Sequence, residues 1–335
     1  DFNGCTDNIT VDIFQPTELT SNEVSVSDVI CFGQSNGSAE VTGVDGTPSY
    51  SYLWSDGQTN ALATGLSFGS YNCTITDFNG CTDNITVEID QPTLLTSNEV
   101  SVSDVSCFGG NNGSAEVEGV NGSPTYSYLW DNGQTTAQIS GLSFGPYTCT
   151  ITDFNGCTDN ITVQVDQPDD LTITLTETNV TCFGDDNGQI TADVQGGITT
   201  SPYNYIWTSD IGVTPSGDDF IDGLAPATYT LNVFDANNCQ ATNQVDITEP
   251  IVLSSNVVNT DSTLCFGSSD GSAEVTGVNG TPNYSYLWSD GQTNALATGL
   301  SVGSYICTIT DFNGCTDNIT VDIFQPTELT SNEVS

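Results

Sequence analysis

The chain has 335 residues, with 43 Asp and Glu and no Lys, Arg or His, so its formal net charge is −43. Nucleic acids and anionic membranes are bound mainly through Lys and Arg, so this composition argues against both as partners. Without His or Lys, a Ser nucleophile has no usual base and phosphoryl transfer has no cationic clamp, so we do not expect an enzyme. No apolar run reaches the roughly 20 residues of a membrane span.

Five Gln-Pro or Glu-Pro pairs divide the chain into similar segments, with prolines at Pro16, Pro92, Pro168, Pro250 and Pro326. A period of about 80 residues is the size of a small independent domain. We therefore predict four repeats, at 17–92, 93–168, 169–250 and 251–326. Residues 1–16 would end a preceding repeat and 327–335 would begin a following one. Because residues 1–25 and 311–335 are identical, and the chain begins with Asp1 and lacks Met, we expect a piece of a longer array.

Within the first repeat, apolar and polar residues alternate in segment after segment, which predicts half-buried antiparallel strands. In chain order the segments are 24–27, 39–42, 50–54, 71–76 and 84–89. The interval between Trp54 and Tyr71 has room for one good strand or two very short ones. Asn79-Gly80 predicts a two-residue hairpin turn in which both central residues have positive φ.

Short strands, regular turns and one Trp in each repeat predict an all-β fold, a tandem array of immunoglobulin-like β-sandwich domains. Tyr71 stands two residues before Cys73, the order of a tyrosine corner followed by a core position. The third repeat has a longer middle segment, including residues 208–219.

Twelve cysteines without a CxxC pair or any His favour structural disulfides in an extracellular protein over a zinc site. The third repeat has Leu231 where the others have Cys73, Cys149 and Cys307, so we predict buried thiols at those three positions. Each remaining cysteine either begins a CFG motif or ends an NGC turn, which reads NNC in the third repeat. Pairing within each repeat would give Cys31–Cys81, Cys107–Cys157, Cys182–Cys239 and Cys265–Cys315.

The number of strands bears on this pairing. Six alternating strands bring the CFG loop and the NGC hairpin to one end of a sandwich, and the bridge within a repeat is then feasible. Seven strands place them at opposite ends, about 20 Å apart, and the CFG loop would have to reach a neighbouring repeat. We prefer the pairing within a repeat, and the alternative stays open.

Oxygen-bearing side chains flank the NGC turns at spacings that could hold Ca²⁺. The candidate ligands are Asp77, Asn79, Asp83, Asp153, Asn155, Asp159, Asp311, Asn313 and Asp317. Hairpin chemistry explains the same pattern, and the spacing is not that of an EF-hand. Tyr52 and Trp54 could stack on a sugar, but their alternation places them on the buried face, which favours core packing.

The order CFGxxxG, PxYxYxW, GLxxGxY and DxNGC resembles the SprB-type repeat of giant cell-surface adhesins of gliding Bacteroidota. In the first repeat its carriers include Cys31-Phe32-Gly33, Trp54, Tyr71 and Asn79-Gly80-Cys81. The resemblance implies an immunoglobulin-like fold, export by type IX secretion, and a place at the bacterial cell surface in adhesion or gliding motility.

We therefore expect a structural stalk segment of an adhesin or extracellular filament. Its partners would be the neighbouring repeats of the same chain, with lateral self-association in a filament and a surface or glycan ligand as further candidates. The alternative is a module that recognises calcium or glycan through exposed loops.

Overall fold

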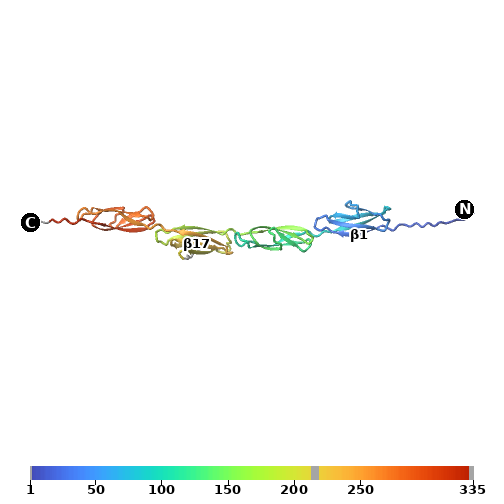
Figure 1. Cartoon of the computed structure of the whole chain (residues 1–335), viewed down its shortest axis with the longest axis horizontal. Helices are drawn as coiled ribbons and strands as arrows, with labels where there is room; N and C mark the ends of the chain where they lie inside the picture. The colour runs from blue at the N-terminus through green and yellow to red at the C-terminus, as the bar shows by residue number, and fades with distance from the viewer. Residues whose placement is uncertain (1, 213–218, 332–335) are drawn as a thin grey trace. The chain divides into compact units, whose positions relative to one another are not determined.

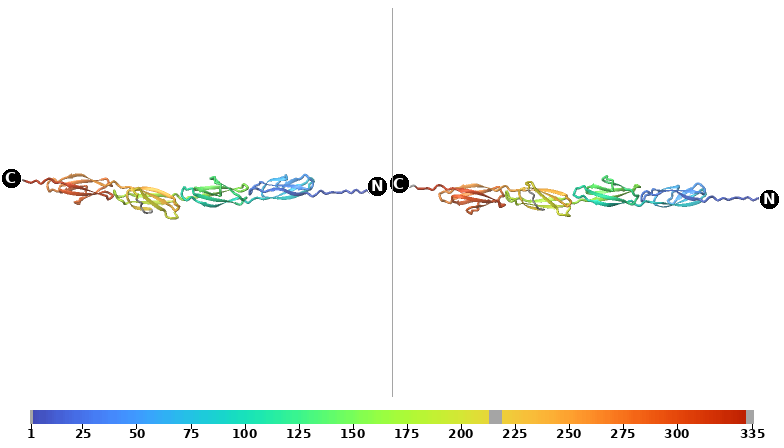
Figure 2. Two further views of the ribbon diagram at one scale, coloured as in Figure 1. Left: turned by 60° about the horizontal axis from the view of Figure 1, so that its bottom comes forward. Right: turned by 90° about the horizontal axis from the view of Figure 1, so that it is seen from below.

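The structure is a computed structural model and describes residues 2–212 and 219–331. Residues 213–218 of the longer middle segment, and the last residues of the expected following repeat, lie outside this range. The chain forms two compact units, Asp1–Gln167 and Pro168–Ser335. Within each repeat the strands run along that repeat's own length (Figures 1 and 2).

Every repeat contains six strands in the described part of the chain. In the first unit they are β1 (Thr20–Ser27), β2 (Gly37–Val44), β3 (Ser51–Trp54), β4 (Leu62–Leu66), β5 (Gly69–Thr76) and β6 (Thr82–Ile89), then β7 (Thr96–Ser103), β8 (Gly113–Val120), β9 (Ser127–Trp130), β10 (Gln138–Leu142), β11 (Gly145–Thr152) and β12 (Thr158–Val165). In the second unit they are β13 (Thr172–Thr178), β14 (Gly188–Gln195), β15 (Asn204–Ser209), β16 (Phe220–Leu224), β17 (Ala227–Phe234) and β18 (Gln240–Ile247), then β19 (Ser254–Asp261), β20 (Gly271–Val278), β21 (Ser285–Trp288), β22 (Leu296–Leu300), β23 (Gly303–Thr310) and β24 (Thr316–Ile323).

Two three-stranded antiparallel sheets make up each repeat. In the first repeat their orders are β1-β2-β4 and β3-β5-β6, and the other three repeats copy this arrangement. The alternation of apolar and polar residues in the sequence matches the alternation of burial in the structure. On β2, Ala39 and Val41 are buried, whereas Glu40 and Thr42 are half-buried. The buried residues of each repeat form a hydrophobic cluster around its own Trp.

The predicted tyrosine corner is present in all four repeats. In the first, the Tyr71 hydroxyl donates to the Ser67 carbonyl at 3.2 Å and accepts from the Ser67 N–H at 3.1 Å. Tyr147, Tyr229 and Tyr305 each donate to the carbonyl four residues upstream. Together with the paired sheets, this confirms the predicted array of immunoglobulin-like sandwiches.

The short strands β3 and β4 determine which loops share an end of the repeat. β4 pairs antiparallel with β2 and so runs parallel to β1, and only two residues separate the end of β4 from the start of β5. Because β3 is antiparallel to β5, β3 and β4 run in the same direction and together make one pass along the sandwich. The repeat therefore has six strands but only five lengthwise passes.

An odd number of passes places the CFG loop and the NGC hairpin at opposite ends of the repeat. Val29 N–H, beside the CFG loop, donates to the Asp90 carbonyl just after β6. At the other end, Phe78 N–H in the hairpin donates to the Thr47 carbonyl just after β2. The expectation that six strands bring these loops together is wrong, because it assumed that every strand reverses direction.

The hairpin between β5 and β6 also differs from the predicted two-residue turn. Gly80 N–H donates to the Asp77 carbonyl and Asp77 N–H to the Cys81 carbonyl, and only Gly80 has positive φ, at 83°. This is a longer loop, a turn followed by one left-handed residue. In the third repeat Asn238 takes the left-handed position with φ of 62°, which Asn tolerates better than most residues.

Candidate functional site

The NGC hairpin of each repeat is held by one buried carboxylate. Asp77 Oδ1 accepts from the N–H groups of Asn79 and Cys81, and Oδ2 accepts from the Thr47 N–H, each at 2.9 Å. The hydrogen bond from Thr47 is the main cause that lowers the pKa of Asp77, with smaller contributions from Cys81 and Asn79, and together they outweigh burial. Asp153, Asp235 and Asp311 repeat these contacts in the other three hairpins.

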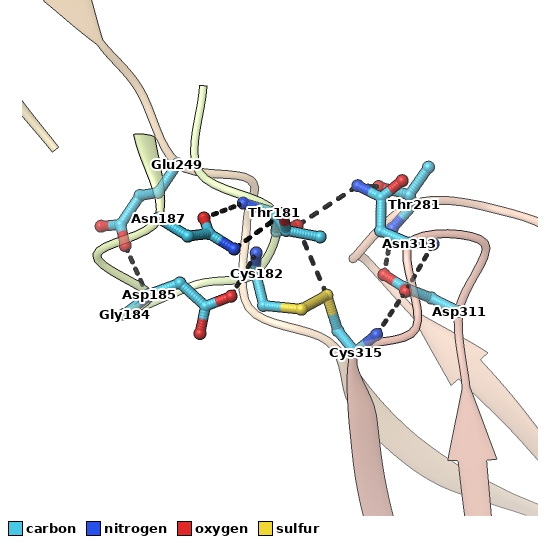
Figure 3. The surroundings of a disulfide bond; sticks show 10 residues. All are labelled: Thr181, Cys182, Gly184, Asp185, Asn187, Glu249, Thr281, Asp311, Asn313 and Cys315. Atoms are coloured by element: carbon cyan, nitrogen blue, oxygen red, sulfur yellow. Dashed lines mark hydrogen bonds between the residues drawn. A yellow bond between two sulfur atoms is a disulfide. The ribbon is translucent and has the colours of Figure 1, made fainter. Parts of the chain in front are cut away.

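Within each unit, a disulfide joins the CFG loop of one repeat to the hairpin of the next. In the first unit Cys31 is bonded to Cys157, with 5.7 Å between their Cα atoms. In the second unit Cys182 is bonded to Cys315, with 5.6 Å between the Cα atoms (Figure 3). Four cysteines from four different repeats are thus used in two equivalent junctions.

A side-chain amide reinforces each junction. Asn155 donates from Nδ2 to the Ile30 carbonyl at 3.3 Å, and Asn313 donates to the Thr181 carbonyl at the same distance. Both amides also donate to a hydroxyl of their own repeat, Ser123 and Thr281 respectively. The Asn of the NGC turn therefore bridges two repeats at the residue before the CFG cysteine.

Internal hydrogen bonds shape the CFG loop that receives the hairpin. In the third repeat, Asn187 Oδ1 accepts from the Thr181 N–H at 2.9 Å and Glu249 Oε2 accepts from the Gly184 N–H at 2.8 Å (Figure 3). In the first repeat Asn36 and Gln91 accept the equivalent bonds, from Ile30 and Gly33. The Gln or Glu before each repeat-ending proline therefore folds back to the CFG loop, a role that sequence reasoning missed.

The predicted pairing of cysteines within each repeat is wrong. Cys31 is not joined to Cys81 nor Cys107 to Cys157, because Cys31 and Cys157 are joined to each other. Likewise the pairs Cys182–Cys239 and Cys265–Cys315 are excluded by the Cys182–Cys315 bond. The physical reason is the odd number of passes, which separates the CFG loop and the hairpin of one repeat by its full length. Cys81 and Cys265 are exposed free thiols, whereas Cys107 and Cys239 are half-buried and disulfide-bonded.

The three remaining predicted thiols are where the sequence placed them. Cys73, Cys149 and Cys307 are fully buried and unoxidised, and Leu231 is fully buried in the third repeat. Cys73 lies opposite Trp54 across β5 and β3. Burial raises the pKa of all three thiols.

The candidate calcium ligands are engaged by protein groups. Asn79 Nδ2 donates to the Thr47 hydroxyl at 2.7 Å, and Asp83 Oδ2 accepts from the Ser21 hydroxyl at 2.6 Å, which lowers the pKa of Asp83. Asn155 and Asn313 serve the junctions, while Asp159 and Asp317 accept from Ser97 and Ser255. Among residues 2–212 and 219–331, no group of three or more Cys, Asp or Glu side chains is arranged to hold a metal ion.

The aromatic residues considered for sugar stacking belong to the core. Trp54 is 2% exposed and donates from Nε1 to the Asn60 carbonyl at 2.9 Å. Tyr52 is half-buried and packs against the same cluster. Other aromatic rings are exposed, among them Phe78, Phe154 and Phe312 at the hairpin tips, which are 71–77% exposed.

Solved structures that are similar to this chain include cell-adhesion and immune proteins. An eight-immunoglobulin-domain fragment of Down syndrome cell adhesion molecule has 12% identity and a TM-score of 0.35 over 92% of this chain and 50% of its own, so the chain spans about half of its length. A tetra-tandem repeat from the extending region of a large adhesion protein has 14% identity and a TM-score of 0.31 over 91% and 99% of the two chains. The insect immune protein hemolin has 11% identity and a TM-score of 0.25 over 90% and 99%. At these values the likeness does not extend to function.

No curated protein sequence matches the chain. In the described residues the structure has no helix that could cross a membrane. The SprB repeat family matches residues 24–59, 100–135, 174–210 and 257–293, which fall one in each of the four sandwiches and include each CFG loop and each core Trp. The chain therefore contains four tandem segments that match the SprB repeat family, one in each sandwich.

Proposed function

We propose that the chain is a tension-bearing stalk segment of a repetitive bacterial cell-surface adhesin. The observation that carries this proposal is the pair of disulfides between successive repeats. A bridge within a repeat would stabilise that repeat, whereas a bridge between repeats joins them in the direction along which the chain would be pulled.

The bridges create a short covalent route through each unit. In the first unit the route follows β1 to Cys31, crosses to Cys157 and leaves along β12. In the second it follows β13 to Cys182, crosses to Cys315 and leaves along β24. Strands are already close to fully extended, so this route has little slack to release. A load would reach the bridges before it could unravel the sheets that lie off the route.

The charge of −43 without cationic side chains suits an exposed surface whose parts repel one another. Structural disulfides persist in oxidising surroundings, which supports a place outside the cell. Export by type IX secretion, a role in gliding motility and lateral association into filaments are the finer parts of this proposal, and they rest on the resemblance to SprB adhesins.

Pulling a single chain by its two ends tests the load route. With the Cys31–Cys157 and Cys182–Cys315 bridges closed, the route allows an end-to-end length of at most roughly 270 Å, against roughly 1,100 Å for the reduced, unfolded chain. We expect the oxidised chain to stop near the shorter limit at forces that unfold the reduced chain. Stepwise lengthening of the oxidised chain towards the longer limit would overturn the proposal.

A single substitution provides a sharper comparison. Cys157→Ser opens the first bridge and should add roughly 400 Å of extensible length. Cys81→Ser is the matched control, because Cys81 has the same place in the same hairpin sequence but is a free thiol. It should leave the extension unchanged.

The second candidate function is recognition of a glycan by exposed loops. The observation that favours it is the exposure of the Phe78, Phe154 and Phe312 rings at the hairpin tips. Calorimetric titration with glycans, repeated with Phe154→Ala, decides between the two. Saturable binding that Phe154→Ala abolishes would favour glycan recognition. Heats of titration that do not saturate would support the stalk function instead.

A further inference from the structure

An open pocket lies at the CFG end of the fourth repeat. It has a volume of about 570 Å³ and is lined by two segments, Leu264-Cys265-Phe266 of the CFG loop and Pro326-Thr327-Glu328-Leu329 after β24. Leu264 is 81% exposed and Leu329 is fully exposed. Apolar side chains this exposed, next to a free thiol, are typical of a surface that binds another protein segment.

The same two segments line a smaller space at each closed junction. In the first unit Cys31, Phe32 and residues 93–95 are joined there by Asp153, Gly156, Cys157 and Thr158 of the hairpin, and the remaining space is about 260 Å³. In the second unit Cys182, Phe183 and residues 252–253 are joined by Gly314, Cys315 and Thr316, and about 290 Å³ remains. The pocket of the fourth repeat is therefore this junction without its hairpin.

Leu329 adds an independent observation. The leucine at this position after the repeat-ending proline is buried in four earlier cases, Leu19, Leu95, Leu171 and Leu253, at 5–8% exposure. In each case it lies against the glycine of the loop after the second strand of the repeat that it begins, as Leu19 does against Gly46. The repeat that would cover Leu329 is the one whose hairpin would fill the pocket.

The CFG loop of the fourth repeat already has the shape of the occupied loops. Leu264 N–H donates to Asp270 Oδ1 at 3.1 Å and Gly267 N–H donates to Gln325 Oε1 at 3.0 Å. These bonds match those of Thr181 with Asn187 and of Gly184 with Glu249 in the third repeat. Docking therefore does not require the loop to refold, which lowers the cost of binding.

We propose that this pocket is the receptor for the Asp-Phe-Asn-Gly-Cys hairpin of a further SprB repeat, closed by a disulfide to Cys265. The hairpin Asn would donate to the Leu264 carbonyl, as Asn313 does to the Thr181 carbonyl. The inference uses the junctions on which the stalk proposal rests, but concerns what the free face binds rather than whether it carries load.

Closure needs an oxidant, which we take to be a small-molecule or protein disulfide. The Cys265 thiolate attacks one sulfur of that disulfide, forms a mixed disulfide and releases one thiol. The hairpin thiolate then attacks the Cys265 sulfur and releases the second thiol. Two thiols lose two electrons and two protons in total, and the oxidant takes up both as it becomes two thiols.

The identity of residues 1–25 and 311–335 provides the probe. Appending residues 26–98 after Ser335 continues the chain into a complete copy of the first repeat, with its own copies of Cys73 and Cys81. The extended chain is folded with glutathione disulfide, free thiols are alkylated, and the linked peptides are identified by mass spectrometry after pepsin digestion. Trypsin would find no site, since the chain has no Lys or Arg.

We expect Cys265 to be joined to the appended copy of Cys81. The original Cys81 gives the same peptide but has no receptor before it, so about half of this peptide should be linked to Cys265 and the rest should be alkylated. Protection of the appended Cys73 copy from alkylation reports that the new repeat is folded. In a Cys265→Ser chain the appended Cys81 copy should become alkylated, with the Cys73 copy still protected.

Three results would overturn the inference. One is alkylation of Cys265 while the appended repeat is folded, another is a bond from Cys265 to Cys315, and the third is a bond between the appended repeat's own CFG and NGC cysteines. A Leu264→Asp chain tests the receptor without touching any thiol, and we expect it to reduce the yield of the Cys265 link at least several-fold. The force measurement does not depend on these outcomes, so the two proposals can fail separately.

Discussion

The Asp77 carboxylate binds three N–H groups from two loops that lie far apart in the chain, at Thr47 and at the Asn79–Cys81 turn. Backbone donors of this kind stabilise the ionised form of a carboxylate. A residue that has the spacing of a calcium ligand in the sequence is thus a structural anchor for the hairpin that crosses to the neighbouring repeat.

Asp77 should make the first repeat sensitive to acid. Its pKa is lower in the folded repeat than in the unfolded chain, so ionised Asp77 stabilises the fold above about pH 4. This stabilisation is lost as the pH falls through the lowered pKa of the folded state. We expect Asp77→Asn to speed the labelling of buried Cys73 at pH 6, and the difference from the unsubstituted chain to shrink towards pH 2.

Labelling with a dithiodipyridine, which reacts with thiols in acid, measures this opening of the first repeat. Cys307 is the control in the same molecule, because it is equally buried but lies in the fourth repeat. If the effect of Asp77→Asn were as large at pH 2 as at pH 6, the charge of Asp77 would not be its cause.

Individual buried positions could be read from the sequence. Alternation predicts a core position for Trp54, and Leu231 in the third repeat predicts one for Cys73; all three residues are buried. The roles of Asn155 and Gln91 could not be read, because each depends on a backbone group that only the folded chain brings near.

At the scale of elements, the five predicted strands of the first repeat are present, and β4 is the one strand that the interval after Trp54 left open. The pairing of the cysteines could not be derived, since it depends on whether β3 and β4 reverse direction. A signal for it did exist. β3 and β4 have four and five residues where their neighbours have eight, which indicates two half-length strands sharing one pass.

The hairpin turn gives a test at this scale. Gly80 has φ of 83°, and a Cβ there would meet no atom within 4 Å, so backbone strain alone opposes substitution. We expect Gly80→Ala to destabilise the first repeat by about 1–2 kcal/mol, and Gly80→Asn by less, as Asn238 in the third repeat suggests.

Urea unfolding, followed by labelling of Cys73, measures both substitutions. Phe78→Ala in the same turn is the control, because Phe78 is 74% exposed and its removal should change the free energy of unfolding by less than about 0.5 kcal/mol. Equal losses for Ala and Asn would show that φ at Gly80 is not the cause.

For the whole molecule, the absence of Lys, Arg and His means that side-chain charges only repel one another. The Debye length, beyond which exposed charges are largely screened from each other, falls from about 30 Å at 0.01 M salt to about 8 Å at 0.15 M. We therefore expect the melting temperature to rise with NaCl over this range.

A comparison of CaCl₂ with NaCl distinguishes charge screening from specific calcium binding. Because Asp77, Asp83 and their counterparts are engaged by protein donors, we expect CaCl₂ to raise the melting temperature no more than NaCl does at equal ionic strength. A further rise that saturates with CaCl₂ and is reversed by a chelator would instead establish a calcium site.

The disulfide between Cys31 and Cys157 also determines whether cleavage of the backbone separates the chain into two pieces. Hydrolysis of any one peptide bond between these two residues leaves both fragments attached, since the sulfur–sulfur bond still connects them. The same holds between Cys182 and Cys315. Most single cuts by a foreign protease would therefore nick the protein without severing it.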